Sequence, residues 1–273
     1  MKYKITLAFA TIVLMSGCQA IEFNFINKED TIENQSLSSE NENNNGSQIL
    51  SEEGQAENLL TLPAQYFNQI EEVDGEKVIQ NYENTLVLVN KIYSLPDSYI
   101  PSDLVRPNVN FSFGDAEVEK ALLRQEAAVA LEKLFLAAEN DGIELFAISG
   151  YRSYNRQIEV FNAEVSMKGL EKAAEAVANP GQSEHQTGLA MDISSRSVNL
   201  DLTQDFENTI EGQWLAANAH EYGFILRYPK GKENITGFKY EPWHFRYVGK
   251  DFARTIYEKN LTLEEYFNIV KEI

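Results

Sequence analysis

Hydrophobic side chains recur with two different periods along the chain, and these periods predict where helices and strands lie. The clearest helical pattern covers residues 115–142, where an apolar residue returns every three or four positions and Asn140, Asp141 and Gly142 supply a stop. Its apolar positions are Leu123, Ala127, Ala130, Leu131, Leu134 and Ala138. The pattern predicts one long helix over residues 115–142.

Shorter patterns continue this mixture toward the C-terminus. Helical spacing followed by a glycine marks residues 154–169 and 211–223, and a last helical pattern covers 261–273. The predicted strands are 143–149, 189–194, 224–229 and 243–249. Because these elements are mixed without a regular βαβ repeat, the sequence predicts an α+β domain with a small, mostly antiparallel sheet and flanking helices.

The N-terminal residues have the pattern of a targeting segment. Lys2 and Lys4 precede the apolar run Ile5 to Gly17, which is too short to span a membrane and suits the core of a signal peptide. The run ends at Cys18, and the stretch LMSGC resembles a bacterial lipobox, in which this cysteine is acylated, although Met15 stands where leucine is usual. The alternative is an ordinary signal peptide with an incidental cysteine.

The following residues lack the apolar side chains that a folded domain needs. They are rich in Asn, Glu and Ser, a composition that cannot bury enough surface to offset the entropy of ordering. We therefore expect a signal peptide at 1–17, a lipidated Cys18 with a disordered acidic linker over 18–58, and one folded domain over 59–273.

Charge and composition narrow the chemistry. The formal net charge is −19, which argues against nucleic acid as a partner, because such partners need basic surfaces. Cys18 is the only cysteine in the chain, so no internal disulfide can form. Any site that uses imidazole must draw on three histidines, which are His185, His220 and His244.

Two of the histidines stand beside carboxylates. Gly188 breaks any helix between His185 and Asp192, and the alternation of residues over 189–194 points Asp192 away from the core, so a tight turn would fold His185 back toward it. In the second stretch, Pro242 lacks a backbone donor and places the start of the strand there. Glu241 then lies beside His244 at the mouth of the strand.

Two neutral imidazoles and one carboxylate can bind zinc in a tetrahedral site that keeps one position for water. Zinc lowers the pKa of that water to about 7, and Glu241 could carry its proton to the leaving amine. Non-haem iron sites use the same ligand types, but they usually place His and Asp one residue apart, and here six residues intervene. The other alternative is two core histidines without a metal. We interpret His220, in the predicted helix 211–223, as structural.

With these residues in place, the chain resembles the zinc D-alanyl-D-alanine carboxypeptidases of the VanY type, which include the L,D-carboxypeptidases (LdcB-like) that trim peptidoglycan stems. The resemblance covers about residues 87–249 and includes the stretches SGYRSYNRQ, SEHQTGLAMDIS and EPWHFRYVG, in the same order and with matching spacing. It implies the small α+β zinc-peptidase fold shared with hedgehog signalling domains. It also implies zinc ligands at His185, Asp192 and His244, with Glu241 as the catalytic base.

The resemblance further implies how substrate is held. Arg152 corresponds to the residue that binds the C-terminal carboxylate of the substrate, with help from Gln157 and Ser183. This agrees with the chemistry, since arginine binds a carboxylate with a charged fork. Ser149 and Tyr154 are further candidates to line the pocket, and Trp243 either walls it or packs in the core.

These inferences predict a zinc-dependent carboxypeptidase that binds one zinc and removes a terminal D-alanine from peptidoglycan stem peptides, by D,D- or L,D-cleavage. We expect a monomer outside the cytoplasm, held on the bacterial cell membrane by its lipid anchor and facing the cell wall. A dipeptidase or endopeptidase on the same fold and a non-catalytic wall-binding module stay open, although binding alone would not need Glu241. The loops 195–211 and 228–240 are expected to decide between D,D and L,D cleavage.

Overall fold

The computed structural model describes residues 60–273. The predicted signal peptide 1–17, the lipidated Cys18 and the linker over 18–58 lie outside the described residues. Within residues 60–273, no helix has both the length and the apolar character needed to cross a membrane.

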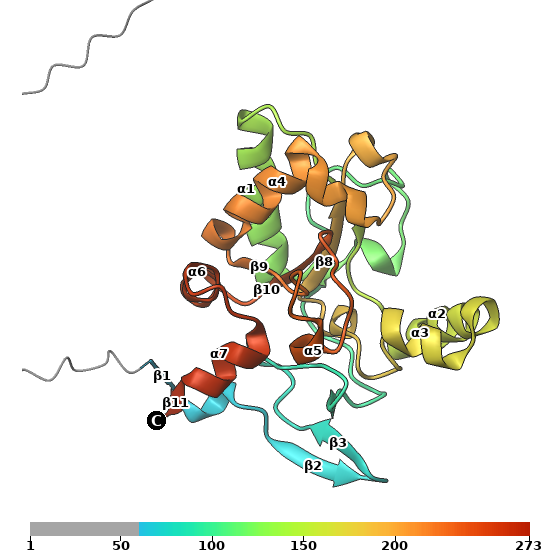
Figure 1. Ribbon diagram of the computed structural model, residues 1–273, viewed down its shortest axis with the longest axis vertical. Helices are drawn as coiled ribbons and strands as arrows, with labels where there is room; N and C mark the ends of the chain where they lie inside the picture. The colour runs from blue at the N-terminus through green and yellow to red at the C-terminus, as the bar shows by residue number, and fades with distance from the viewer. Residues whose placement is uncertain (1–59) are drawn as a thin grey trace, which may run out of the picture. The chain divides into compact units, whose positions relative to one another are not determined.

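A four-stranded antiparallel sheet organises the described residues (Figure 1). In spatial order its strands are β7 (Phe146–Ser149), β8 (Ala190–Ser194), β10 (His244–Tyr247) and β9 (Phe224–Leu226). The four strands lie within the four segments that the sequence predicted, and the sheet confirms the predicted α+β class.

Helices surround this sheet. They are α1 (Gln125–Asn140), α2 (Tyr154–Lys168), α3 (Leu170–Ala176), α4 (Ile210–Asn218), α5 (Glu233–Thr236), α6 (Lys250–Glu258) and α7 (Leu263–Ile269). The helices predicted over 154–169 and 211–223 are confirmed, and each pattern ends at its glycine, Gly169 after α2 and Gly223 after the 3-10 turn that follows α4. The helix predicted over 261–273 is shorter, because its last residues form a strand.

The prediction of one helix over 115–142 is wrong in its first part. The α-helix α1 begins only at Gln125, because Leu123 and Arg124 form the short strand β6, which pairs with β5 (Leu104–Val105). The Arg124 side chain also donates to the Asp103 carboxylate over 3.0 Å. A pairing partner about 20 residues earlier therefore overrides the local helical pattern.

The two faces of the sheet have different roles. On one face, side chains such as Ala147, Met191 and Phe245 belong to the same buried core as Leu131 and Leu134 of α1. Because side chains alternate across a strand, the residues between them point to the opposite face. Along β8 and β10 these residues include Asp192 and His244.

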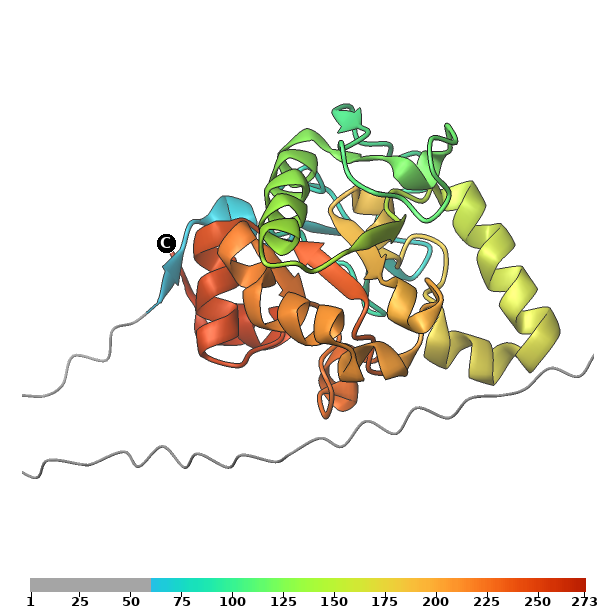
Figure 2. The same ribbon diagram turned by 90° about the horizontal axis from the view of Figure 1, so that it is seen from above.

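The remaining strands are short and lie at the edges of the fold. They are β1 (Thr61–Leu62), β2 (Ile70–Val73), β3 (Glu76–Ile79), β4 (Tyr93–Ser94) and β11 (Lys271–Glu272). β1 pairs in parallel with β11, so the two ends of the described chain lie together. Helices α2 and α3 project from the rest of the fold as an arm, seen in both Figure 1 and Figure 2.

Candidate active site

Strand pairing places two of the three predicted metal ligands side by side. Asp192 of β8 lies directly opposite His244 of β10 in the antiparallel register, and Ser149 of β7 lies opposite Asp192 on its other side. Side chains at directly opposed positions start about 5 Å apart and share a face. The register alone thus sets the carboxylate of Asp192 against the His244 imidazole.

A tight turn brings in the third predicted ligand. His185 lies in the 3-10 turn Glu184–Thr187, which ends at Gly188 in the left-handed region with φ 67°. A side chain at Gly188 would be strained there, and its Cβ would lie 2.9 Å from the Leu104 side chain. The glycine lets the chain reverse into β8, so the predicted return of His185 toward Asp192 is confirmed.

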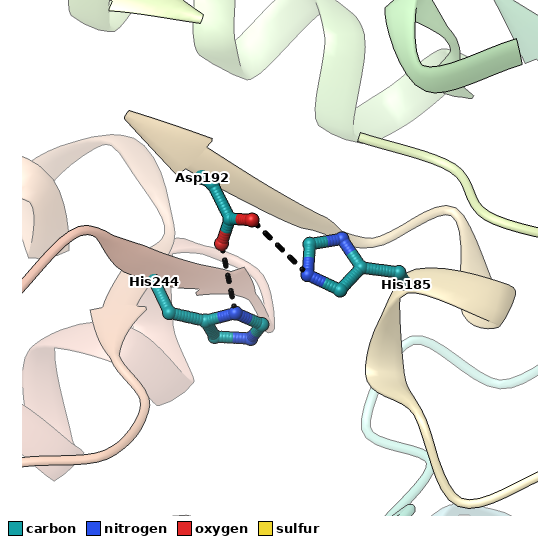
Figure 3. Close-up of side chains that lie close together, drawn as sticks. All are labelled: His185, Asp192 and His244. Atoms are coloured by element: carbon teal, nitrogen blue, oxygen red, sulfur yellow. Dashed lines mark hydrogen bonds and ion pairs between the residues drawn. The ribbon is translucent and has the colours of Figure 1, made fainter. Parts of the chain in front are cut away.

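The three side chains converge, as Figure 3 shows. His185 Nε2 lies 3.4 Å from Asp192 Oδ2, and His244 Nδ1 lies 3.0 Å from Asp192 Oδ1. In each histidine, the outer ring nitrogen, which points away from Asp192, has a hydrogen-bond partner of its own. His185 Nδ1 donates to the Gly150 carbonyl over 2.8 Å, and His244 Nε2 lies 3.4 Å from Glu184 Oε2. Both inner nitrogens therefore face the Asp192 carboxylate.

This arrangement fits a metal ion. One ligand atom from each of His185, Asp192 and His244 lies within 4.8 Å of the others, and all three side chains are buried. Imidazole nitrogen and carboxylate oxygen are ligands that zinc accepts, and outer-nitrogen bonds of this kind fix ring orientation in metal sites. Among residues 60–273, His185, Asp192 and His244 form the one cluster of three or more His, Cys, Asp or Glu side chains that could hold a metal ion.

The protonation of the two rings differs in the metal-free protein. Burial lowers the pKa of His185 to about 3, so this ring is neutral and ready to bind a cation. Burial also disfavours charge on His244, but its hydrogen bonds to Asp192 and Glu184 outweigh that effect and raise its pKa to about 9. A metal must therefore displace a proton from His244.

Glu241 stands at the edge of this cluster. The His244 N–H donates to the Glu241 carbonyl over 3.2 Å, which closes a turn around Pro242, and the Glu241 carboxylate lies 3.8 Å from His244 Nδ1. Burial, reinforced by the charge of Asp192, raises the pKa of Glu241 to about 7. A carboxylate with a pKa near neutrality suits a general base, which must both take and return a proton.

Arg152 lines the same pocket. It directly precedes Ser153, which caps the N-terminus of α2, and its backbone N–H donates to the His185 carbonyl over 3.2 Å. Its guanidinium donates to Gln157 Oε1 over 3.1 Å and to Ser149 Oγ over 3.3 Å. Gln157 is fully buried and donates in turn to the Ala178 carbonyl over 2.7 Å. The structure thus places Gln157 behind Arg152 rather than on the open surface of the pocket.

Other predicted residues complete the walls. Ser183 and Trp243 line the pocket, and Trp243 also packs against the main core, so both of its predicted roles apply. Leu202, from the loop 195–211, and Phe238, from the loop 228–240, also face the pocket. Tyr154 is not among the residues that line it. His220 lies elsewhere and stacks on Tyr257 at 3.7 Å between ring centroids, which agrees with a structural role.

Sequence reasoning missed Glu184, the residue directly before His185. Its carboxylate is fully buried and contacts His244, Arg227 and Arg246. A signal was present, because Arg227 and Arg246 interrupt aromatic and aliphatic strand segments, and charged residues are rarely fully buried unless they are paired. Two such arginines require a buried carboxylate nearby.

Comparison with known proteins adds an independent line of observation. A model of the family VanY, D-alanyl-D-alanine carboxypeptidase, matches residues 120–250. The putative carboxypeptidase YodJ of Bacillus subtilis (strain 168) is 58% identical over 214 residues, which are 78% of this chain and 78% of that protein. The family match covers the segments that carry the candidate site.

Similar solved structures point to the same family. A structure of the LdcB LD-carboxypeptidase is 58% identical, covers 78% of this chain and 100% of its own, and superposes with a TM-score of 0.76. A mutant of the vancomycin resistance D,D-pentapeptidase VanY in complex with Zn(II) is 35% identical, covers 67% of this chain and 99% of its own, and has a TM-score of 0.56.

Proposed function

Because the chain belongs to the VanY family of D-alanyl-D-alanine carboxypeptidases, we propose that it is a zinc-dependent carboxypeptidase that removes the terminal D-alanine of a peptidoglycan stem peptide. The observation that carries this proposal is a single pocket lined by Arg152, Glu241 and the three convergent side chains His185, Asp192 and His244. A carboxypeptidase needs both parts together, a cation for the free carboxylate and a hydrolytic centre beside it.

We propose a monomeric enzyme with one zinc per chain, held by His185, Asp192 and His244, which converge in one pocket. Zinc in this position would supply a Lewis acid that acidifies water and polarises a carbonyl. The solved VanY relative in complex with Zn(II) supports this choice of metal. Metal analysis of the purified, reconstituted protein should give one zinc per chain.

The protein side chains would then divide the reaction between them. Arg152 binds the terminal carboxylate of the substrate and so sets which peptide bond enters the site. Glu241 accepts a proton from the attacking water and gives it to the nitrogen of the departing D-alanine, which leaves as the free amino acid. Trp243, Leu202 and Phe238 add apolar side chains to the wall of the pocket.

We further propose that the bond cleaved is the one between an L-configured residue and a terminal D-alanine. The support is the relation to the LdcB LD-carboxypeptidase, which is much closer than the relation to the D,D-pentapeptidase, 58% against 35% identity. Both loops expected to decide this specificity, 195–211 and 228–240, contribute side chains to the pocket.

One experiment tests both the reaction and its specificity. The purified zinc-loaded protein is incubated with a stem tetrapeptide, which ends in an L-residue followed by D-alanine, and with a pentapeptide, which ends in D-alanyl-D-alanine. Mass spectrometry should show loss of one alanine from the tetrapeptide and slow or no reaction of the pentapeptide. Preferred cleavage of the pentapeptide would instead assign D,D specificity, and release of an intact dipeptide from either would assign an endopeptidase that cuts within the stem.

We also propose that the enzyme works outside the cytoplasm, anchored to the bacterial membrane through a lipid on Cys18. The support is the apolar run Ile5 to Gly17 before the only cysteine of the chain. In cells, the wild type should fractionate with membranes, and Cys18→Ser should release the protein into the soluble fraction. Retention of Cys18→Ser in the membrane would show that the apolar run stays uncleaved as the anchor.

A further inference from the structure

A buried ion network lies next to the metal-binding side chains, on the far side of the His244 ring. Its centre is Glu184, whose Oε1 accepts from Arg227 Nε over 2.8 Å and from Arg246 Nη1 over 2.7 Å. The other oxygen, Oε2, lies 3.4 Å from His244 Nε2. The two arginines thus occupy one oxygen of Glu184 and leave the other for the histidine.

The network continues to the C-terminal helix α7. Arg227 donates through both terminal nitrogens to the Glu264 carboxylate, over 2.9 Å and 2.6 Å. Arg246 donates through Nη2 to the carbonyls of Thr85 and Val87, over 3.0 Å and 2.8 Å. Both guanidinium groups and Glu184 are fully buried, while Glu264 retains 11% of its side-chain exposure. Two cations and two carboxylates balance, as a buried network requires.

The contacts exclude a direct role of Glu184 as a ligand of the same ion. Its carboxylate meets the Nε2 edge of the His244 ring, whereas Asp192 meets the Nδ1 edge. An ionised carboxylate only accepts hydrogen bonds, so in the metal-free protein each nitrogen of the His244 ring carries a hydrogen toward its carboxylate. When a cation replaces the hydrogen on Nδ1, Glu184 keeps the other hydrogen on Nε2. Glu184 therefore selects the tautomer in which His244 can bind a cation beside Asp192.

We infer that Glu184 is a positioning residue for His244, and that the buried chain Glu184–Arg227–Glu264 holds it in place from helix α7. This inference rests on the proposed metal site. It assigns a task to parts of the chain outside residues 120–250, where the family model matches, since Glu264, Thr85 and Val87 all lie beyond that range. The metal site then depends on segments that contribute none of its ligands.

Two variants of the full chain test the inference, with a third as control. Glu184→Gln keeps the size of the side chain but replaces one acceptor oxygen by an NH₂ group, which cannot accept from either arginine or from His244. Glu264→Gln weakens the distant end of the chain and leaves Glu184 in place. Glu221→Gln removes a carboxylate from an exposed ion pair with Arg254, where such pairs contribute little.

The readouts are the zinc affinity, measured by competition with a chelator, and the visible absorption spectrum of the cobalt(II)-substituted protein. Circular dichroism of each metal-free variant first establishes that it is folded. We expect Glu184→Gln to lower zinc affinity about 10- to 100-fold and to alter the cobalt bands, as for other groups that orient a metal ligand. Glu264→Gln should lower the affinity several-fold, and Glu221→Gln should match the wild type.

A purely structural role would reduce the melting temperature and leave the zinc affinity and cobalt spectrum of the folded variants unchanged. That result, in either Glu184→Gln or Glu264→Gln, would overturn the inference. If Glu184→Gln does not fold, Glu264→Gln alone decides by the same two readouts. Zinc binding and tetrapeptide cleavage by the wild type test the proposed function separately, so failure of one is not mistaken for failure of the other.

Discussion

Two parts of the pocket are built in different ways: the proposed metal side, with His185, Asp192 and His244, and the proposed carboxylate-binding side, with Arg152. On the metal side, Asp192 and His244 sit opposite each other on paired strands, and His185 is fixed by a turn that only glycine fits well at its end. On the other side, Arg152 comes from the loop between β7 and α2 and is oriented by two polar side chains, Ser149 and Gln157.

This difference indicates which segments of the protein can change in sequence without loss of the reaction. The register of a sheet with one buried face is strongly specified, since a slip of one residue turns every side chain to the other face. Loops and helix ends tolerate change much better. We therefore expect reaction type to be set by the sheet, and the choice of substrate to be set by the loops 195–211 and 228–240 and by the arm formed by α2 and α3.

The largest effect should come from Glu241, which lies on the metal side but is not one of the three converging ligands. Glu241→Gln keeps the shape of the side chain and removes its ability to take a proton. We expect kcat to fall about 100- to 10,000-fold, while the zinc content stays at the wild-type level. A mutant with nearly normal kcat would show that another group acts as the base.

Arg152 should give the next largest effect, and it tests the carboxylate-binding side alone. Arg152→Ala should lower kcat/KM for a peptide with a free C-terminal carboxylate. The loss should correspond to about 2–5 kcal/mol of transition-state stabilisation, and the zinc content should not change. Amidating the C-terminus of the substrate should greatly reduce cleavage by the wild type and reduce the penalty of the mutation.

Arg156→Ala is the matched control, because Arg156 is an exposed arginine four residues further on that pairs with Glu159. It should behave as wild type toward both substrates. Equal cleavage of acid and amide by the wild type would favour an endopeptidase instead.

Gln157 should have a smaller effect through Arg152. Gln157→Leu removes the acceptor for the guanidinium and the donor to the Ala178 carbonyl, and a hydrogen bond to a charged group contributes about 1.5–3 kcal/mol. We expect kcat/KM for the free acid to fall about tenfold or more, with a smaller change for the amide. An equal loss on acid and amide would indicate that Gln157 only supports the fold.

The sequence predicted the metal side better than the network behind it. Alternation over 189–194 and 243–249 is a local signal, and it located β8 and β10, with Asp192 and His244 on one face. The network of Glu184, Arg227 and Glu264 joins residues 37 or more positions apart, and no local period encodes such a pairing.

Two further differences between the predicted and the observed elements have identifiable causes. The helix predicted from residue 115 fails because β6 finds its partner in β5, which the sequence pattern of 115–142 does not contain. The hairpin of β2 and β3 was not predicted, although Asp74 and Gly75 form its turn with φ 53° and 84°. Asp-Gly is a strong signal for such turns, because both positions must adopt positive φ.

The smallest effect concerns a single proton and examines the metal side without any mutation. In the metal-free protein His244 has a pKa raised to about 9 and His185 has a pKa lowered to about 3. At pH 8, His244 therefore carries an extra proton that must leave when Nδ1 binds zinc, whereas His185 is already neutral. Glu241, with a pKa raised to about 7, is mostly ionised at this pH and adds little.

Zinc binding at pH 8 should consequently release about two protons, one from His244 and one from the zinc-bound water, whose pKa zinc lowers to about 7. Isothermal titration calorimetry in buffers of different ionisation enthalpy measures this number directly. The His244 proton should contribute about a tenfold rise in apparent zinc affinity per pH unit below pH 9 and nothing above it, because this competing proton is then already gone. If only one proton is released at pH 8, the zinc-bound water accounts for it and His244 is neutral before the metal arrives, so its bonds to Asp192 and Glu184 do not hold a charge on the ring.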